Sequence, residues 1–265
     1  MLDPKQKLAA LQSEQQLIAN NYKEADTVLK NCEIKLIELR GAISAVEDII
    51  KKECSDKDVA VHLSGGVDST SLAIAAQRLG KNVNTYSFHL ENNPTYDSRK
   101  AEETSQLMGW KFTKVIVPTD KIKEDFHELR LKYKCIKKVH YECTFPFMYI
   151  YPKIKESIIL SGIAADGHYG LSKRAMMHYK HTKELIDKFR GEYFKQSNPA
   201  GLSQQILLAK NYNKKFVAPY LVNSVIKFFK QYDWFEMNKP KEKQHVINAF
   251  PEFKKIGKLK KHWNL

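Results

Sequence analysis

A short loop, Ser64-Gly65-Gly66-Val67-Asp68-Ser69, combines residue types that are suited to holding phosphate. The two glycines have no Cβ atom to keep an anion away from the backbone amides, and they tolerate positive φ. A helix that starts after the loop would add partial positive charge, and the hydroxyls of Ser64 and Ser69 can donate hydrogen bonds. Asp68 would repel phosphate unless a cation lies between them, which assigns Asp68 to Mg²⁺. Ser64, Gly65, Gly66, Asp68 and Ser69 are therefore predicted to bind a nucleotide, with a ligand-free glycine turn as the alternative.

The loop differs from a kinase-type phosphate loop, because the chain contains no G-x-x-x-x-G-K-[ST] sequence. Transfer of the γ-phosphoryl group is therefore not the expected reaction. The S-G-G-x-D-S pattern after a buried strand instead resembles the PP-loop ATP pyrophosphatase superfamily, which includes asparagine synthetase, NAD and GMP synthetases and several tRNA-thiolating enzymes. The resemblance implies that ATP adenylates a substrate oxygen, that pyrophosphate is released, and that a nucleophile then displaces AMP.

A second segment, residues 161–170, resembles the asparagine synthetase sequence S-G-E-G-x-D-E-x-x-G-G-Y at Ser161, Gly162, Asp166 and Gly170. The resemblance implies that Ser161 and Gly162 bind the nucleotide and that Asp166 binds the metal. A carboxylate at the end of a neighbouring strand would face Asp68 across the phosphates, and two carboxylates with phosphate oxygens suit octahedral Mg²⁺. For Asp166, capping of a glycine-containing turn is the alternative.

The strand expected after the first loop contains Thr85-Tyr86-Ser87-Phe88. This segment is similar to the family sequence T-F-S-I-G-F, whose backbone contacts adenine. The resemblance implies that Ser87 and Phe88 help to bind ATP. Without the resemblance, the same residues would fit an ordinary core strand.

Two departures from the family concern the substrates. The acidic residues that the family has around the second segment are Ile163 and Gly167 here, which puts aspartate in doubt as the substrate. Asparagine synthetase also has a glutaminase domain whose nucleophile is an N-terminal cysteine, whereas residue 2 is Leu2 and a long helix replaces that domain. We therefore expect no glutamine hydrolysis, and an amine that comes from free ammonia, another amine or a separate protein.

Basic residues near the C-terminus are candidate catalytic groups. Residues 243–249 partly match the family pattern K-x-x-L-R-x-A, with Ile247 in place of the arginine. A family lysine that stabilises the adenylation transition state corresponds to Lys258 or Lys260, and a cation beside the α-phosphate is electrostatically favourable. We predict Lys243 and Lys258 as catalytic residues, with solvated lysines as the alternative.

Histidines and cysteines are expected to be structural. His140 and His168 are predicted to pack or to lie at the surface rather than to act as acid–base groups. The chain has four cysteines and no CxxC pair, which argues against a zinc knuckle or a dithiol redox motif. Idle thiols are expected, with sulfur chemistry between Cys135 and Cys143 as the alternative.

Strand-like and helix-like segments alternate between residues 58 and 171. Strands are predicted at 58–63, 84–90, 112–117 and 157–161, and helices at 70–79, 98–108, 120–133 and 144–155. Crossovers of this length require a parallel sheet covered on both faces, and the ligands of such sheets bind at the carboxyl ends of the strands. The sequence therefore predicts a doubly wound α/β domain over 58–171 that is similar to the adenine nucleotide alpha hydrolase fold.

Residues 1–57 are predicted to form one long coiled-coil helix. Apolar residues recur with alternating spacings of three and four over about six heptads, from Leu8 and Leu11 to Val46 and Ile50. Such a stripe needs a partner. A second subunit is favoured over the chain's own catalytic domain, so a homo-oligomer is expected.

Positive charge is concentrated in the last third of the chain. The formal net charge is +14, and residues 172–265 carry 20 basic and 7 acidic side chains. This region has helical segments near 176–190, 202–210, 219–231 and 241–249, and it could bind nucleic acid or form a solvated face of a phosphate-handling enzyme. No long apolar run and no secretory signal occur, so we expect no membrane association and a cytoplasmic location.

Three functional hypotheses follow. The first is an AMP-forming ligase that adenylates a small-molecule carboxylate and joins it to an amine or ammonia through an amide or other C–N bond, with ATP and Mg²⁺ as cofactors. The second is a PP-loop enzyme that modifies a tRNA or DNA base, which the basic C-terminal third motivates. The third is a catalytically idle nucleotide-binding oligomer.

Overall fold

A computed structural model describes residues 3–196 and 198–257, without the side chains of 4–11, 31–40 and 42–43. The chain divides into two compact units, Met1–Gly41 and Ala42–Leu265. The catalytic lysine candidate Lys258 lies outside the described residues, so its role stays a prediction. Among the described residues, no helix is both long and apolar enough to cross a membrane.

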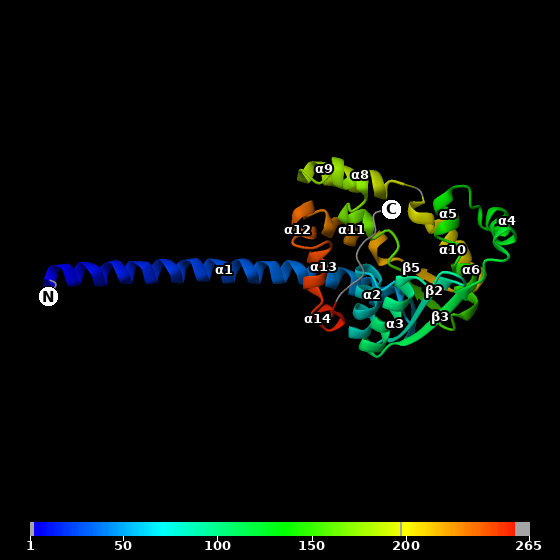
Figure 1. The fold of residues 1–265 in the computed structure, drawn as a ribbon, viewed down its shortest axis with the longest axis horizontal. Helices are drawn as coiled ribbons and strands as arrows, with labels where there is room; N and C mark the ends of the chain where they lie inside the picture. The colour runs from blue at the N-terminus through cyan, green and yellow to red at the C-terminus, as the bar shows by residue number, and fades with distance from the viewer. Residues whose placement is uncertain (1–2, 197, 258–265) are drawn as a thin grey trace. The chain divides into compact units, whose positions relative to one another are not determined.

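The first unit consists of helix α1, which spans Pro4–Glu53 and continues into the second unit (Figure 1). All side chains from residue 12 to residue 30 are exposed to solvent within this chain. They include large apolar residues of the predicted stripe, such as Ile18, Tyr22 and Leu29. The long helix is confirmed, and the coiled-coil partner stays a prediction.

The second unit is built on a five-stranded sheet in the order β3-β2-β1-β4-β5, with all neighbouring strands parallel. The strands are β1 Asp58–His62, β2 Asn82–Leu90, β3 Lys111–Val117, β4 Ile158–Leu160 and β5 Lys215–Val217. The doubly wound parallel fold is confirmed. The short strand β5 was not predicted, and it joins the sheet from the region that the sequence predicts as helical.

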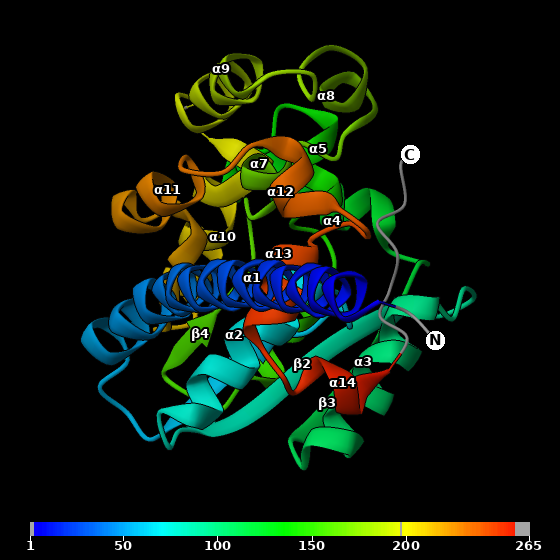
Figure 2. The ribbon, with the colours of Figure 1, turned by 90° about the vertical axis from the view of Figure 1, so that its left-hand side faces the viewer.

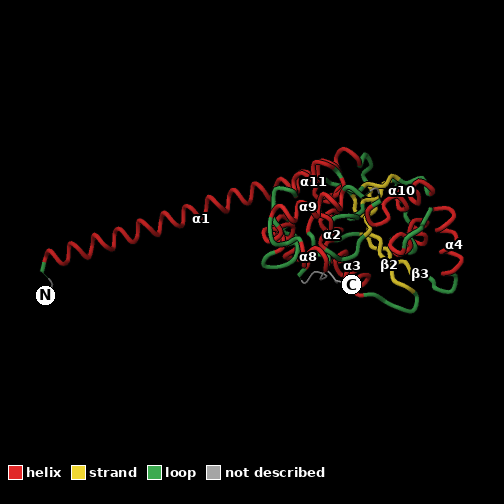
Figure 3. The backbone as a smooth tube through the Cα atoms, turned by 90° about the horizontal axis from the view of Figure 1, so that it is seen from above, coloured by secondary structure: helices red, strands yellow, loops and turns green. Residues whose placement is uncertain are grey.

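Helices cover both faces of this sheet (Figures 2 and 3). Helices α2 (Val67–Arg78) and α3 (Tyr96–Met108) lie against β1, β2 and β3 on one side. Helix α6 (Phe147–Ile150) contacts β2 and β3, and α10 (Leu202–Asn211) contacts β5 and α6. The remaining helices are α4 Ile122–Tyr133, α5 Lys138–Glu142, α7 Asp166–Tyr169, α8 Lys173–His178, α9 Lys183–Phe194, α11 Asn223–Phe229, α12 Trp234–Asn238, α13 Gln244–Ala249 and α14 Phe253–Ile256.

Three predicted helices are interrupted. One of them, 219–231, consists of a 3₁₀ turn, η3 Pro219–Leu221, and α11. The predicted helix 144–155 consists of α6 and a 3₁₀ turn, η1 Tyr151–Lys153, because Pro146 and Pro152 lack the amide hydrogens that a regular helix needs. The predicted helix 176–190 is divided into α8 and α9. Thr182 starts α9 by accepting a hydrogen bond from the amide of Leu185.

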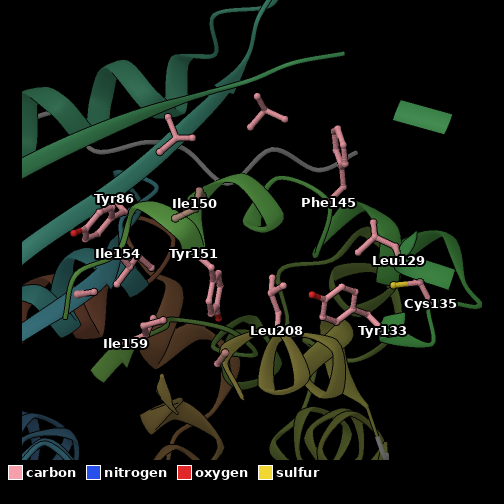
Figure 4. Close-up of a cluster of buried hydrophobic side chains, with 14 residues drawn as sticks. Tyr86, Leu129, Tyr133, Cys135, Phe145, Ile150, Tyr151, Ile154, Ile159 and Leu208 are labelled. Atoms are coloured by element: carbon pink, nitrogen blue, oxygen red, sulfur yellow. The ribbon is translucent and has the colours of Figure 1, made fainter. Parts of the chain in front are cut away.

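A cluster of buried side chains fills the space between the sheet and helices α4, α6 and α10 (Figure 4). Ala60 and Ile159 come from the central strands, whereas Leu129 and Leu208 come from α4 and α10. Their burial removes apolar surface from water and fixes the central strands, whose carboxyl ends carry both predicted motifs.

Candidate active site

Both predicted motifs follow the central strands of the sheet. Residues 64–69, the first loop, come after β1, and residues 161–166, the second loop, come after β4. Strands β1 and β4 are direct neighbours, with Ala60 opposite Ile159 and Val61 opposite Leu160. The connections from these two strands lead to opposite ends of the sheet, and this switch point is where open α/β sheets bind their ligands.

The first loop is held in a shape that only glycine tolerates at its second position. Gly65 has φ +71°, and a Cβ atom there would lie 2.9 Å from the backbone nitrogen of Ala101. The amide of Ser64 donates to Oγ of Ser69 over 3.1 Å, which closes the loop. Gly66 caps α2 without a side-chain hydrogen bond, so this helix N-terminus is available to an anion.

The second loop packs directly on the first. A Cβ atom on Gly162 would lie 3.2 Å from the backbone nitrogen of Ser69 and 3.3 Å from Cβ of Asp68. Oγ of Ser161 accepts a hydrogen bond from the amide of Ile163 over 3.3 Å. Ala164 adopts φ +66°, a conformation that is rare for a residue with a side chain. The absence of a side chain at Gly162 therefore lets the two loops approach each other.

Lys243 joins the two loops. Its Nζ atom lies 2.5 Å from Oδ2 of Asp68 and 2.8 Å from Oδ1 of Asp166, and 4.9 Å from the centre of the Tyr169 ring. Burial alone would lower the pKa of Lys243, but the two carboxylates outweigh burial and raise the pKa above its ordinary value. Lys243 is therefore a buried ammonium ion at neutral pH, and a solvated lysine is wrong for this residue.

Asn238 positions both Lys243 and the short helix α7. Its buried side chain accepts a hydrogen bond from the amide of Lys243 over 3.1 Å and donates to the carbonyl of Tyr169 over 3.1 Å. Arg190 is also fully buried and donates to the carbonyl of His168 over 2.9 Å. No local sequence pattern marks the contacts of Asn238 and Arg190 with α7, because Tyr169 and His168 lie far from them in the chain.

A cavity of about 370 Å³ opens beside the two loops. Gly65, Gly66 and Lys243 do not line it. Gly65 and Gly66 shape the first loop, and Lys243 reaches Asp68 and Asp166. The predicted residues that do line the cavity are Ser64, Asp68, Ser69, Ser87, Phe88, Ser161, Gly162 and Asp166.

His62 also lines the cavity, although no sequence motif indicated a role for it. It ends β1, lines the cavity, and packs with its ring centre 4.5 Å from that of Phe147. Burial lowers the pKa of His62 to about 3, so the imidazole is neutral at physiological pH. The signal in the sequence that could have indicated this position is a polar residue that follows the apolar run Val59-Ala60-Val61.

His140 and His168 pack inside the protein, whereas idle thiols stay a prediction because Cys143 lines the cavity. His168 is buried, stacks on Phe229 with ring centres 4.4 Å apart, and forms a 2.8 Å hydrogen bond with the carbonyl of Tyr220. His140 is also buried. Cys135 and Cys143 are free, and burial raises the pKa of both thiols, which keeps them protonated.

The donor set of the two carboxylates fits Mg²⁺. Asp68 and Asp166 both reach one cation, the Lys243 ammonium, so their oxygens are close enough to share a metal ion with phosphate oxygens. Among the described residues, no group of three or more His, Cys, Asp or Glu side chains forms a metal cage. A Mg²⁺ ion here would therefore need ligands from the nucleotide.

Comparison with known proteins identifies the family. The asparagine synthase family model matches residues 43–243, well over half of the chain. No curated protein matches the sequence significantly. Two similar solved structures are a predicted subunit of tRNA methyltransferase from Methanocaldococcus jannaschii (18% identity, 66% of this chain and 76% of that chain covered, TM-score 0.39) and NMN synthetase from Francisella tularensis (16% identity, 74% and 93% covered, TM-score 0.37). The chain belongs to the asparagine synthase family, whose members use ATP.

Proposed function

We propose that this protein is an AMP-forming ligase that adenylates a carboxylate and then forms an amide or other C–N bond. The observation that carries the proposal is the meeting of Asp68 and Asp166 on the buried ammonium of Lys243, beside the uncapped N-terminus of α2. This arrangement brings candidate metal ligands and the partial positive charge of a helix N-terminus to the place where triphosphate would lie. Family membership supports the use of ATP.

Each group of residues has a separate task in this proposal. Residues 64–69 bind the phosphates, Ser87 and Phe88 contact the base, and Ser161 and Gly162 close the site from the second loop. Asp68 and Asp166 hold Mg²⁺, which neutralises phosphate charge when bound. Lys243 stabilises the charge that develops at the α-phosphate, because its ammonium stays protonated. Lys258 is kept as a second candidate for the same task.

The proposed reaction has two steps. A carboxylate oxygen of the acceptor attacks the α-phosphorus of ATP, the bond between the α- and β-phosphates breaks, and pyrophosphate leaves. An amine nitrogen then attacks the acyl carbon, AMP leaves with the former carboxylate oxygen, and the nitrogen loses a proton. We propose free ammonia or an amine as the nucleophile, and a cytoplasmic enzyme.

A panel assay tests this function against base modification of tRNA or DNA, which the net charge of residues 172–265 favours as the second candidate. Pyrophosphate release from ATP is measured with amino acids, simple carboxylates, bulk tRNA or DNA, each with ammonium. Stimulation by a small carboxylate supports the ligase. Stimulation by nucleic acid alone establishes base modification instead, and ATP binding without any turnover leaves an idle nucleotide-binding protein.

We also propose that α1 pairs with a second copy of the chain. Its heptad positions Ile18, Tyr22 and Leu29 are exposed, and apolar residues at such positions are stabilised by burial against another helix. Light scattering on the purified protein is expected to give a dimer or a larger oligomer. Replacement of Ile18 and Leu29 by Glu is expected to give a monomer, whereas the same change at the polar heptad position Gln15 is not.

A further inference from the structure

A buried lysine on α3 packs against the first loop. Lys100 is only 6% exposed, and a Cβ atom on Gly65 would lie 2.9 Å from both Cβ and Cγ of Lys100. The stem of this lysine is therefore in contact with the backbone of the loop. Thr95 and Asp97, at the start of the same helix, line the cavity. Lys100 follows Asp97 by three residues, so its backbone lies about one helical turn from the cavity wall.

Among the described residues, the ammonium of Lys100 has one hydrogen-bonding partner. Its Nζ atom lies 3.2 Å from Oε2 of Glu103, whose side chain is 62% exposed. An ammonium carries three donor hydrogens, and its burial is costly unless they are satisfied. An exposed carboxylate stabilises a cation only weakly, because water competes for both charges. The surroundings of Lys100 therefore leave donor capacity for a second anionic group.

The other buried residues of α3 are all uncharged, namely Ser98, Ala101, Thr104 and Ser105. A side chain that only filled space on this face would be apolar, because burial of a charge costs more. In the present arrangement Lys100 pairs with Glu103 and does not line the cavity. A lysine stem is flexible, however, and its ammonium can turn to another anion. The structure therefore places a cation beside the phosphate loop with a partner that phosphate can replace.

We propose that Lys100 binds the β- and γ-phosphates of ATP, and then the pyrophosphate product, by exchanging the Glu103 carboxylate for phosphate oxygens. The inference rests on the proposed function, in which residues 64–69 bind the phosphates of ATP. Lys243, which contacts a carboxylate of each loop, is assigned to the α-phosphate, so Lys100 is assigned to the phosphates that leave. Phosphate groups carry more negative charge than a carboxylate and form strong charge-assisted hydrogen bonds, so they compete well for this ammonium.

Calorimetric titration of the full chain with inorganic pyrophosphate and Mg²⁺ tests the inference, because this binding requires neither an acceptor nor turnover. Lys100→Gln is expected to weaken pyrophosphate binding by about tenfold. Glu103→Gln is expected to strengthen it by about two- to fivefold, because the competing carboxylate is lost. Glu102→Gln is the matched control, since it breaks the ion pair of the neighbouring α3 residue with Lys114. This control should leave the affinity within about twofold.

Opposite effects of Lys100→Gln and Glu103→Gln separate phosphate binding from a structural ion pair. A structural pair predicts that both variants lower the free energy of unfolding and leave pyrophosphate affinity within about twofold, which overturns the inference. Weaker or unchanged binding in Glu103→Gln also overturns it, even if Lys100→Gln does not fold. Failure of the ligase function alone would leave these binding changes intact without AMP formation. A parent protein that binds no pyrophosphate overturns both the inference and the phosphate role of residues 64–69.

Discussion

The hydrogen bonds that hold the first loop in shape come mainly from its own residues, whereas the shape of the second loop depends on residues far along the chain. Ser64 and Ser69 close the first loop by hydrogen bonds, and Gly65 fits against α3. The second loop leads into α7, whose carbonyls are held by Asn238 and Arg190. A self-contained loop is recognisable from its local sequence. A loop that is shaped by distant contacts tolerates a different local sequence, as at residues 163 and 167.

The two loop carboxylates also differ in exposure. The side chain of Asp68 is 18% exposed, whereas that of Asp166 is 50% exposed, although both contact Lys243. A charge in a drier environment interacts more strongly with a nearby cation. The first loop is therefore expected to carry more of the catalytic effect, and the following predictions test this difference.

The largest effect is expected from Asp68→Asn. Loss of this carboxylate removes a proposed metal ligand and a partner of Lys243, and kcat for pyrophosphate release should fall by about 10²–10³-fold. Asp166→Asn should lower kcat less than Asp68→Asn does, because the Asp166 carboxylate is more exposed. The exposed Asp120→Asn is the matched control. Equal losses at Asp68 and Asp166 would contradict the difference between the loops. Weaker ATP binding in Asp68→Asn, without turnover in either the variant or the parent protein, would indicate an idle protein.

Lys243→Gln tests the cation that joins the loops. We expect kcat to fall by about 10²-fold, because the charge at the α-phosphate is no longer stabilised. The raised pKa of Lys243 means that its ammonium contributes stability fully below the unfolded pKa and loses it only as pH rises through the folded value. Activity should therefore show no alkaline loss from this group below about pH 10. Unchanged kcat, with the exposed Lys230→Gln as control, would exclude a catalytic Lys243.

Asn238 tests whether distant contacts shape the second loop. Asn238→Ala removes the hydrogen bonds to Lys243 and Tyr169, and Asn238→Asp retains only an acceptor for the Lys243 amide. Both variants should lower kcat by about tenfold with little change in KM for ATP, because the reacting groups are displaced. The exposed Asn248→Ala is the control. A loss of thermal stability without a change in kcat would show that Asn238 stabilises the fold but does not position the reacting groups.

Alanine substitutions compare the glycines of the two loops through the free energy of unfolding. Gly65→Ala combines positive φ with a 2.9 Å backbone contact and should cost more than about 2 kcal/mol. Gly162→Ala meets only a 3.2 Å contact and should cost about 1 kcal/mol. Gly80→Ala is the control: Gly80 has φ +74° and no atom within 4 Å of an added Cβ, so this variant measures the cost of the backbone conformation alone. Equal costs in urea unfolding at Gly65 and Gly80 would show that the contact with α3 adds nothing.

The smallest effect concerns two buried histidines, His62 before the first loop and His168 after the second. Burial lowers the pKa of each to about 3, so the folded protein does not take up the proton that the unfolded chain binds below about pH 6.5. Stability is therefore present above that pH and is lost as pH falls. As the pH falls from 6.5 to 5.5, each buried histidine should lower the free energy of unfolding by about 1 kcal/mol. His62→Gln should flatten the urea-unfolding profile, whereas exposed His127→Gln should not.

Local patterns allowed most of the sheet and the first loop to be predicted. Strands β1, β2 and β3 are long or strongly apolar, and the first loop contains its own hydrogen-bonding partners. Strand β5 has only three residues, and its pairing with β4 depends on a contact far along the chain. Such a strand has no periodic signal that would separate it from a loop.

The sequence indicated where the two loops lie, at the ends of neighbouring strands, but not which side chains connect them. Asp68 and Asp166 were predicted to bind Mg²⁺; the structure brings both carboxylates to Lys243, and the metal stays a prediction. The buried position of Lys243 depends on Asn238 and on the left-handed conformation at residue 243, φ +57°, which no spacing indicates. The cavity residue His62 was missed because a single polar residue in a strand has many structural explanations.

The most direct test of the central claim is phosphorus NMR of ATP turnover with Mg²⁺, ammonium and a stimulating carboxylate. Adenylation predicts AMP and pyrophosphate in equal amounts, and the rate at which both form should fall by about 10²–10³-fold in Asp68→Asn. Labelling of the acceptor carboxylate with ¹⁸O should place the label in AMP. ADP and inorganic phosphate as the products, or AMP without the label, would contradict the account.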